Sequence, residues 1–237
     1  MSAAARVAGK VHKWLALLMA IQILFWFVSG LFFAIAPIDQ VRSEHVKADS
    51  AAPPVSAQAA AAGLQKLGNQ PPGEKIEIRS LMGAPVALKS PHEGRPRLYD
   101  LQSGRIISPI SASQARAIAE ADYSGDLRAA RVTLVTEEST EYRAALPAWR
   151  VDFDDDASRA LYVAQDTGAV TARRSTLWRV FDFLWSLHIM DYGDRDDFRH
   201  PLIVVFAIFA NLTVLSGIVL WATRVVRALR RSRPGTR

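Results

Sequence analysis

The chain has 237 residues, no cysteine and a formal net charge of +6. The lack of cysteine excludes disulfides, thiolate metal sites and a cysteine nucleophile. The positive charge does not indicate a nucleic-acid partner, because it is concentrated at the two ends: no acid precedes the first apolar stretch or follows the second, and all 23 acids lie between them.

Two stretches, residues 14–38 and 201–223, contain no Asp, Glu, Lys or Arg. Each exceeds the roughly 20 apolar residues that a helix needs to cross a lipid bilayer, so both are predicted to be transmembrane helices. Basic residues concentrate in cytoplasmic flanks, which places residues 1–13 and the basic tail 224–237 in the cytoplasm and the long loop outside. A cleaved signal peptide is the alternative for the first stretch, but its apolar run is too long for one.

Between the spans, residues 39–55 are polar and contain Pro53-Pro54, which predicts a tether. A folded part follows and consists of two similar repeats, over residues 56–110 and 111–175. Each copy has an Ala-rich helical stretch and then short strand candidates with a period of two, which predicts a helix packed on a small antiparallel sheet. Ser113 stands where the second helix would have its N-cap. The strand candidates are residues 75–79, 85–89, 97–100, 130–135, 148–153 and 160–164.

Several of these segments resemble a known family. The Pro-Ala-Trp-Arg-Val segment at residues 147–151 and the closing Leu-Tyr-Val-x-x-x-Thr-Gly-x-Val hairpin are similar to the PepSY domain. The likeness is weaker in the first repeat, which lacks the Trp-x-Val strand. Two further segments resemble the PepSY-associated transmembrane family. One is Leu187-His188-Ile189-Met190-Asp191-Tyr192, which precedes a helix with Ser216-Gly217. The other is His12-Lys13-Trp14, which precedes a helix with Ser29-Gly30.

The resemblance and the spans together imply an α+β membrane protein of the bacterial inner membrane. Two transmembrane helices would flank an extracytoplasmic, periplasmic domain of two PepSY-like repeats. Residues 176–200 connect this domain to the second span and include a segment with polar residues on one face and Phe181, Trp185 and His188 on the other. The segment is too short to span a membrane and is predicted to be an interfacial amphipathic helix.

No catalytic signature is visible: the sequence has no phosphate loop, dinucleotide fingerprint, nucleophile elbow or His-Glu-x-x-His. The acidic run around Asp154 is predicted to be a solvated turn rather than a metal site. Histidines remain as candidate cofactor ligands. His12 is expected at the inner face, and His188 and His200 near the outer face, whereas His45 and His92 are assigned no role.

Two interpretations of the role of His188 are open. An interfacial imidazole commonly hydrogen-bonds to a carbonyl or a lipid headgroup. Imidazole also suits axial ligation of haem iron, and some relatives of the PepSY-associated family are implicated in reducing ferric siderophores with haem b held by membrane histidines. The resemblance thus implies electron transfer across the membrane. The alternatives are a non-enzymatic module that docks or inhibits a periplasmic protein partner such as a peptidase, and an accessory subunit that anchors a reductase.

Gln22 and Asn211 are the amides inside the two charge-free stretches. Polar side chains at that depth usually face another helix. A lone pair of helices offers them few partners and resembles half of a four-helix bundle, so we expect a homodimer. Two-fold symmetry would then pair His12 with its copy, and His188 with its copy or with His200, giving one haem at each side of the membrane.

Overall fold

The computed structural model describes residues 3–48, 54–68, 75–125 and 127–231. The chain forms two compact units, one made of Met1–Ala36 with Phe181–Arg237 and the other of Pro37–Val180. We call them the helical unit and the repeat unit. Pro53 of the predicted tether and the end of the basic tail, from Ser232, lie outside the described residues.

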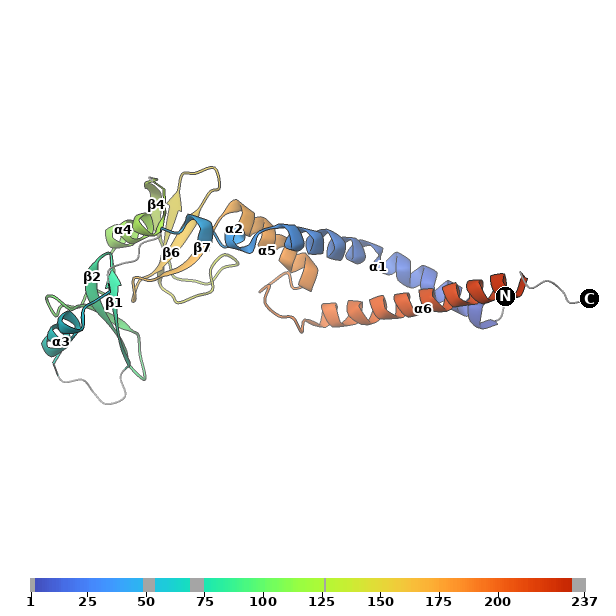
Figure 1. The fold of residues 1–237 in the computed structure, drawn as a ribbon, viewed down its shortest axis with the longest axis horizontal. Coiled ribbons are helices and arrows are strands. Elements are labelled where there is room, and N and C mark those ends of the chain that lie inside the picture. The colour runs from blue at the N-terminus through green and yellow to red at the C-terminus, as the bar shows by residue number, and fades with distance from the viewer. Residues whose placement is uncertain (1–2, 49–53, 69–74, 126, 232–237) are drawn as a thin grey trace, which may run out of the picture. The chain divides into compact units, whose positions relative to one another are not determined.

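The helical unit contains two long helices, α1 (Ala3–Ile35) and α6 (Pro201–Arg231), together with the second half of α5 (Thr176–Ile189). The long helices run side by side with the start of α1 near the end of α6 (Figure 1). Residues 6–35 and 201–229 are long and apolar enough to cross a membrane. The helix α1 begins well before the charge-free stretch, because Lys10 and Lys13 mark the edge of the apolar run without ending the helix.

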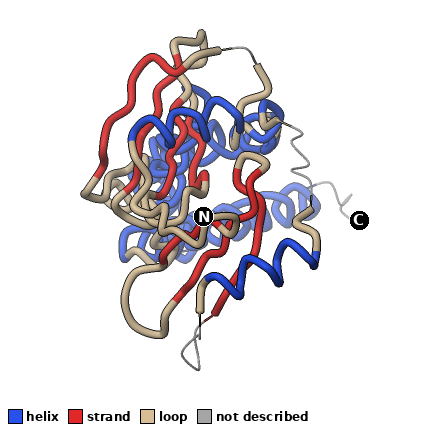
Figure 2. The backbone as a smooth tube through the Cα atoms, turned by 90° about the vertical axis from the view of Figure 1, so that its left-hand side faces the viewer, coloured by secondary structure: helices blue, strands red, loops and turns tan. Residues whose placement is uncertain are grey.

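In the repeat unit, the first repeat contains α3 (Ala57–Lys66) and the antiparallel strands β1 (Lys75–Leu81), β2 (Ala84–Ser90) and β3 (Arg97–Asp100). The second contains α4 (Ala112–Asp122) and β4 (Ala129–Val135), β5 (Ala148–Phe153), β6 (Ala160–Ala164) and β7 (Val170–Arg174), paired in that order. Figure 2 shows the strands of the two sheets in red. The predicted fold class, two helix-plus-antiparallel-sheet repeats between long apolar helices, is confirmed.

The helix α4 begins two residues earlier than the sequence predicts. Its N-cap is Ser111, not Ser113. Ser111 accepts from the backbone N–H of Gln114, and the Gln114 side chain accepts from the backbone N–H of Ser111 at 2.8 Å. This reciprocal capping box requires Gln or Glu three residues after the cap, and Ser113 has no such partner.

The two repeats share one hydrophobic core. Val86 and Leu98 of the first sheet are buried in the same cluster as Ile118 of α4 and Val151 and Leu161 of the second sheet. Sharing a core explains why neither small sheet needs to be stable alone. A satellite cluster lies on the other side of the second sheet, where the rings of Tyr142 and Tyr162 stack with centroids 4.4 Å apart.

The predicted tether forms defined structure over its described residues up to Ala48. It contains α2 (Ile38–Val41) and the 3-10 turn η1 (Glu44–Val46), and it then pairs with the end of α4. The backbone N–H of Ala48 donates to Asp122 O at 2.8 Å, and that of Ser124 donates to Val46 O at 2.9 Å. Backbone pairing of this kind leaves no mark in the composition on which the tether prediction rested.

The start of α5 is held to the second repeat by Glu141. Its carboxylate accepts from Arg179 Nε at 2.6 Å and from Arg150 at 2.9 Å. Burial opposes ionisation of Glu141, but the Arg179 hydrogen bond and the charges of Arg179 and Arg150 outweigh it and hold the pKa of Glu141 below its usual value. The acidic run predicted as a solvated turn also forms ion pairs, with Asp152 bound to Arg150 and Asp155 bound to Arg159.

Candidate functional site

His12 lies inside α1 and packs against the middle of α6. Its Nδ1 is 3.0 Å from the carbonyl oxygen of Thr213 and 3.0 Å from the hydroxyl of Ser216. The Ser216 hydroxyl in turn donates to Thr213 O at 2.8 Å. His12 is half-buried and makes no hydrogen bond through Nε2 within the residues that the structure describes.

His188, in the last turn of α5, has a parallel arrangement with α1. Its Nδ1 is 2.7 Å from the hydroxyl of Ser29, which is completely buried. The Ser29 hydroxyl donates to Phe25 O, one turn earlier in α1, at 2.6 Å. Over the described part of the chain, Nε2 of His188 likewise has no hydrogen-bond partner.

The contacts of His12 fix its tautomer. A carbonyl oxygen only accepts, so Nδ1 of His12 must carry the hydrogen that is donated to Thr213 O. His188 takes the same tautomer when the single proton of Ser29 is donated to Phe25 O, at 2.6 Å, because the Ser29 oxygen is then the acceptor for Nδ1. In a neutral imidazole, Nε2 then holds an unshared lone pair, which is the state in which histidine binds a metal.

The end of α5 is built onto one face of α1. Gln22 Nε2 donates to Leu187 O at 3.0 Å and Trp26 Nε1 donates to His188 O at 2.8 Å, which satisfies two of the carbonyls left open at a helix C-terminus. Gln22, Trp26 and Ser29 recur at helical spacing, so they share this face. The expectation that Gln22 faces another helix is thus confirmed. Asn211 is exposed in the single chain, and its amide donates to Ala207 O of its own helix.

The two centres differ in their ring contacts. His188 touches Phe33 edge-on, with centroids 5.5 Å apart, and stacks on Trp185 at 6.5 Å. His12 lies instead against the backbone of Gly217, where an added Cβ would come within 3.2 Å of the imidazole Cε1. Glycine therefore allows the close approach at His12. The corresponding Gly30 of α1 has open space around it.

Comparison with family models finds a match to the PepSY-associated TM region over residues 9–237. The chain belongs to this family. Comparisons with curated proteins and with solved structures give no match. The match covers both long helices, both histidine centres and the repeat unit.

Of the three candidate ligands in this PepSY-associated protein, His200 is held differently. It precedes α6, and its Nδ1 is buried without a partner among the described residues. It lies near Asp191, whose carboxylate accepts from the backbone N–H groups of Gly193, Asp196 and Asp197. Burial raises the pKa of Asp191, but these hydrogen bonds and His200 lower it by more, so it lies below its usual value.

The structure does not bring His12 and His188 together. Ser29, the partner of His188, is about 25 Å along α1 from His12, at about 1.5 Å of rise per residue. The described residues contain no group of three or more His, Asp or Glu placed to hold a metal ion. Each histidine therefore offers one free ligand atom at its own level of the helical unit.

Sequence reasoning named the histidines but not the groups that orient them. Thr213, Ser216 and Ser29 were missed as partners, although Ser29-Gly30 and Ser216-Gly217 had been noted as a recurring pair. The structure gives the recurrence a meaning, since the serine of each helix anchors the histidine of the other half of the chain. A serine within an apolar helix is the signal that could have found Ser29 and Ser216.

Proposed function

We propose that this membrane protein binds haem b through His12 and His188 and carries electrons across the membrane to ferric iron on the outer side, with a ferric siderophore as the acceptor complex. One observation carries the proposal. Each histidine has Nδ1 hydrogen-bonded to a serine or carbonyl and Nε2 without a partner among the described residues. His12 lies on a helix long and apolar enough to cross a membrane, and His188, on the shorter α5, is bonded to that same helix through Ser29. A metal-ligating histidine is oriented in this way by its second nitrogen.

Haem supplies one-electron chemistry when it is bound. The residues of this chain would fix the ligand tautomer, hold each ring at a defined level and keep the two levels apart. Since each level has one such histidine per chain, a homodimer would complete two pairs of axial imidazoles by two-fold symmetry. His200 remains the second choice as partner of His188, because its Nδ1 has no anchor of the kind seen at the other two histidines.

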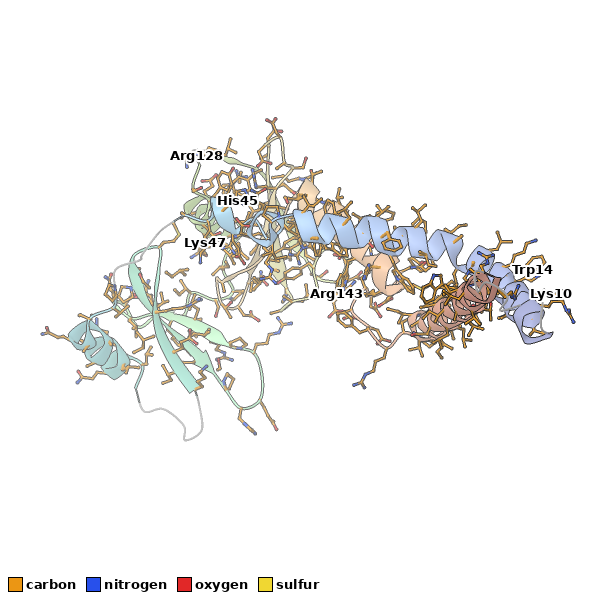
Figure 3. The ribbon with its side chains drawn as sticks, turned by 45° about the vertical axis from the view of Figure 1, so that its right-hand side comes forward. Lys10, Trp14, His45, Lys47, Arg128 and Arg143 are labelled. Atoms are coloured by element: carbon orange, nitrogen blue, oxygen red, sulfur yellow. The ribbon has the colours of Figure 1, made fainter. Side chains whose placement is uncertain are left out.

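The orientation that we propose puts both termini in the cytoplasm and the repeat unit in the periplasm of a bacterial inner membrane. The basic flanks support it, since no acid precedes residue 14 or follows residue 223. Trp14 and Trp221 are 66% and 67% exposed. They lie toward the start of α1 and the end of α6, respectively, where interfacial aromatic residues are common. Lys10 and Trp14 project from this part of α1 (Figure 3).

The test of the cofactor is an absorption spectrum of protein expressed with an ample haem supply and purified in detergent. We expect a Soret band and a reduced-minus-oxidised spectrum typical of low-spin haem b. Addition of a ferric siderophore to the reduced protein should restore the oxidised spectrum. Absence of Soret absorption would reject electron transfer and leave a module that docks a periplasmic protein.

The test of the orientation uses reporters that are active only outside the cytoplasm. A reporter inserted at Ser139, in a loop of the repeat unit, should be active, and one fused after Arg237 should be inactive. Activity at the C-terminus would reject the proposed topology. Light scattering in detergent should give the mass of two chains, and a monomer at micromolar concentration would reject the symmetric haem sites.

A further inference from the structure

A cleft in the repeat unit has no part in the histidine centres. It lies between the end of β1 and the turn after it on one side, and α4 and β7 on the other, and we call it the β1–α4 cleft. Its volume is about 590 Å³. Pockets of roughly 300–1,000 Å³ are the usual size for small organic ligands.

Cationic side chains predominate in the β1–α4 cleft. Lys47, Arg79 and Arg173 line it, against a single lining carboxylate, that of Asp122. Arg173 forms a two-pronged ion pair with Asp122, through Nε at 2.8 Å and a terminal nitrogen at 2.6 Å. These two charges offset each other. The remaining positive charge belongs to Lys47 and Arg79.

Arg79 has an unmet hydrogen-bonding requirement. One terminal nitrogen donates to Thr167 O, but the Nε–H is buried and has no acceptor among the described residues. Burial lowers the pKa of Arg79, with the nearby carboxylate of Glu77 opposing the change. A guanidinium stays charged under these conditions, so a buried donor without an acceptor is costly unless something else supplies one.

Lys47 supplies a second positive charge at the exposed edge of the β1–α4 cleft. It follows η1, is labelled in Figure 3, and makes no ion pair in the part of the chain that the structure describes. Its position is fixed by the backbone pairing of its segment with the end of α4. The charge is thus held at the cleft by the ordered part of the tether.

The other lining is apolar. Leu81, Met82, Ile118 and Val170 contribute to it. Met82 is 57% exposed and sits in the β1–β2 turn with φ of +51°, followed by Gly83 with φ of +83°. This two-residue turn geometry suits a tight hairpin but is unfavourable for a residue other than Gly or Asn. The turn therefore presents a flexible, exposed thioether at the rim.

We propose that the β1–α4 cleft binds a small organic anion, a carboxylate with an apolar body. Its carboxylate would pair with the guanidinium of Arg79 and with Lys47, and its apolar part would lie against Met82 and Ile118. Carboxylate is the planar acceptor that a guanidinium matches best. The proposal does not depend on haem, since every residue in it belongs to the repeat unit.

The experiment is calorimetric titration of the full-length protein in detergent with 4-phenylbutyrate, with its neutral amide and with inorganic phosphate. We expect saturable binding of the acid and at least tenfold weaker binding of the amide, because the amide has no charge for Lys47 and Arg79. Phosphate should also bind at least tenfold more weakly, because it cannot use the apolar side. Equal affinity for the acid and either other probe overturns the proposal.

Variants locate the site. Arg79→Gln and Lys47→Gln should each weaken binding of the acid about tenfold, and Lys47→Gln tests the site without altering a buried group. Arg128→Gln is the control, because Arg128 is exposed, pairs with Glu120 and lies outside the β1–α4 cleft. Unchanged affinity in the Lys47 variant, with unaltered thermal unfolding, overturns the proposal even if the Arg79 variant fails to fold.

Discussion

The His12 centre and the His188 centre use the same hydrogen bonds in different surroundings. In both, Nδ1 is hydrogen-bonded to a serine hydroxyl that also contacts a carbonyl of its own helix. His12 has a second acceptor in Thr213 O and lies against glycine, whereas His188 depends on Ser29 alone for Nδ1 and is packed between aromatic rings. The number of acceptors determines how strongly the orientation of each ring depends on its serine. The packing determines how far each ring can move.

The largest expected effect comes from removing one ligand at a time. His12→Ala and His188→Ala should each lower the reduced-minus-oxidised absorbance by about half, since in the homodimer each variant removes both imidazoles of one of the two sites. The double variant should lose all of it. His92→Ala is the control, because His92 is exposed in the first repeat. Loss of the whole signal in one single variant would show that the two centres are not independent.

A smaller and unequal effect is expected from the serines. Ser29→Ala leaves Nδ1–H of His188 without an acceptor and should weaken haem retention about tenfold or more, as loss of such supporting hydrogen bonds commonly does. Ser216→Ala leaves Thr213 O in place for His12 and should change retention by less than about threefold. Haem content after dilution, and the midpoint potential of each centre, measure the difference. Equal effects would contradict the asymmetry.

Still smaller effects are expected from the paired glycines. Gly217→Ala places a Cβ at 3.2 Å from His12 Cε1, so the ring must move by a few tenths of an ångström and the midpoint potential of the inner centre should shift. Gly30→Ala meets nothing within 4 Å and should leave the outer centre unchanged while favouring the helix by up to about 1 kcal/mol. A shift of the outer midpoint potential in Gly30→Ala, with no shift of the inner one in Gly217→Ala, would contradict the packing described for the two glycines.

A substitution of Glu141 is expected to lower stability without changing the haem spectrum, so it serves as a control for unfolding. Glu141→Gln leaves the positive charges of Arg150 and Arg179 without their shared carboxylate and should lower the stability of the repeat unit by ~2 kcal/mol. Circular dichroism during thermal unfolding measures this loss. The haem absorbance at room temperature should not change, and a decrease would mean that the spectra report unfolding.

The same variant has a predicted pH dependence. Because the pKa of Glu141 is lower in the folded than in the unfolded chain, its contribution is complete above the usual carboxylate pKa and is lost as the pH falls through the lowered folded value. The stability difference between the native protein and Glu141→Gln should therefore be constant from pH 6 to 8 and shrink below about pH 4.5. A difference that grows on acidification would contradict the assignment.

Much of the fold could be predicted because it depends on local patterns. Charge-free stretches locate the long helices, and strand patterns locate β1 to β6 but not β7. Three of the strands, β3, β5 and β6, begin and end where the sequence predicts. Errors arose where a local pattern has more than one solution. Ser111 and Ser113 are both plausible caps until the Gln114 side chain selects one.

The sequence by itself determined that this is a two-span membrane protein with a doubled helix-and-sheet domain and three histidines near its apolar helices. Only the tertiary structure decided how those histidines are held. His188 and Ser29 are 159 residues apart in the chain, and His12 and Ser216 are 204 apart. Residues so distant meet only when the helices pack, and the packing then decides which ring nitrogen is hydrogen-bonded and which one is left without a partner.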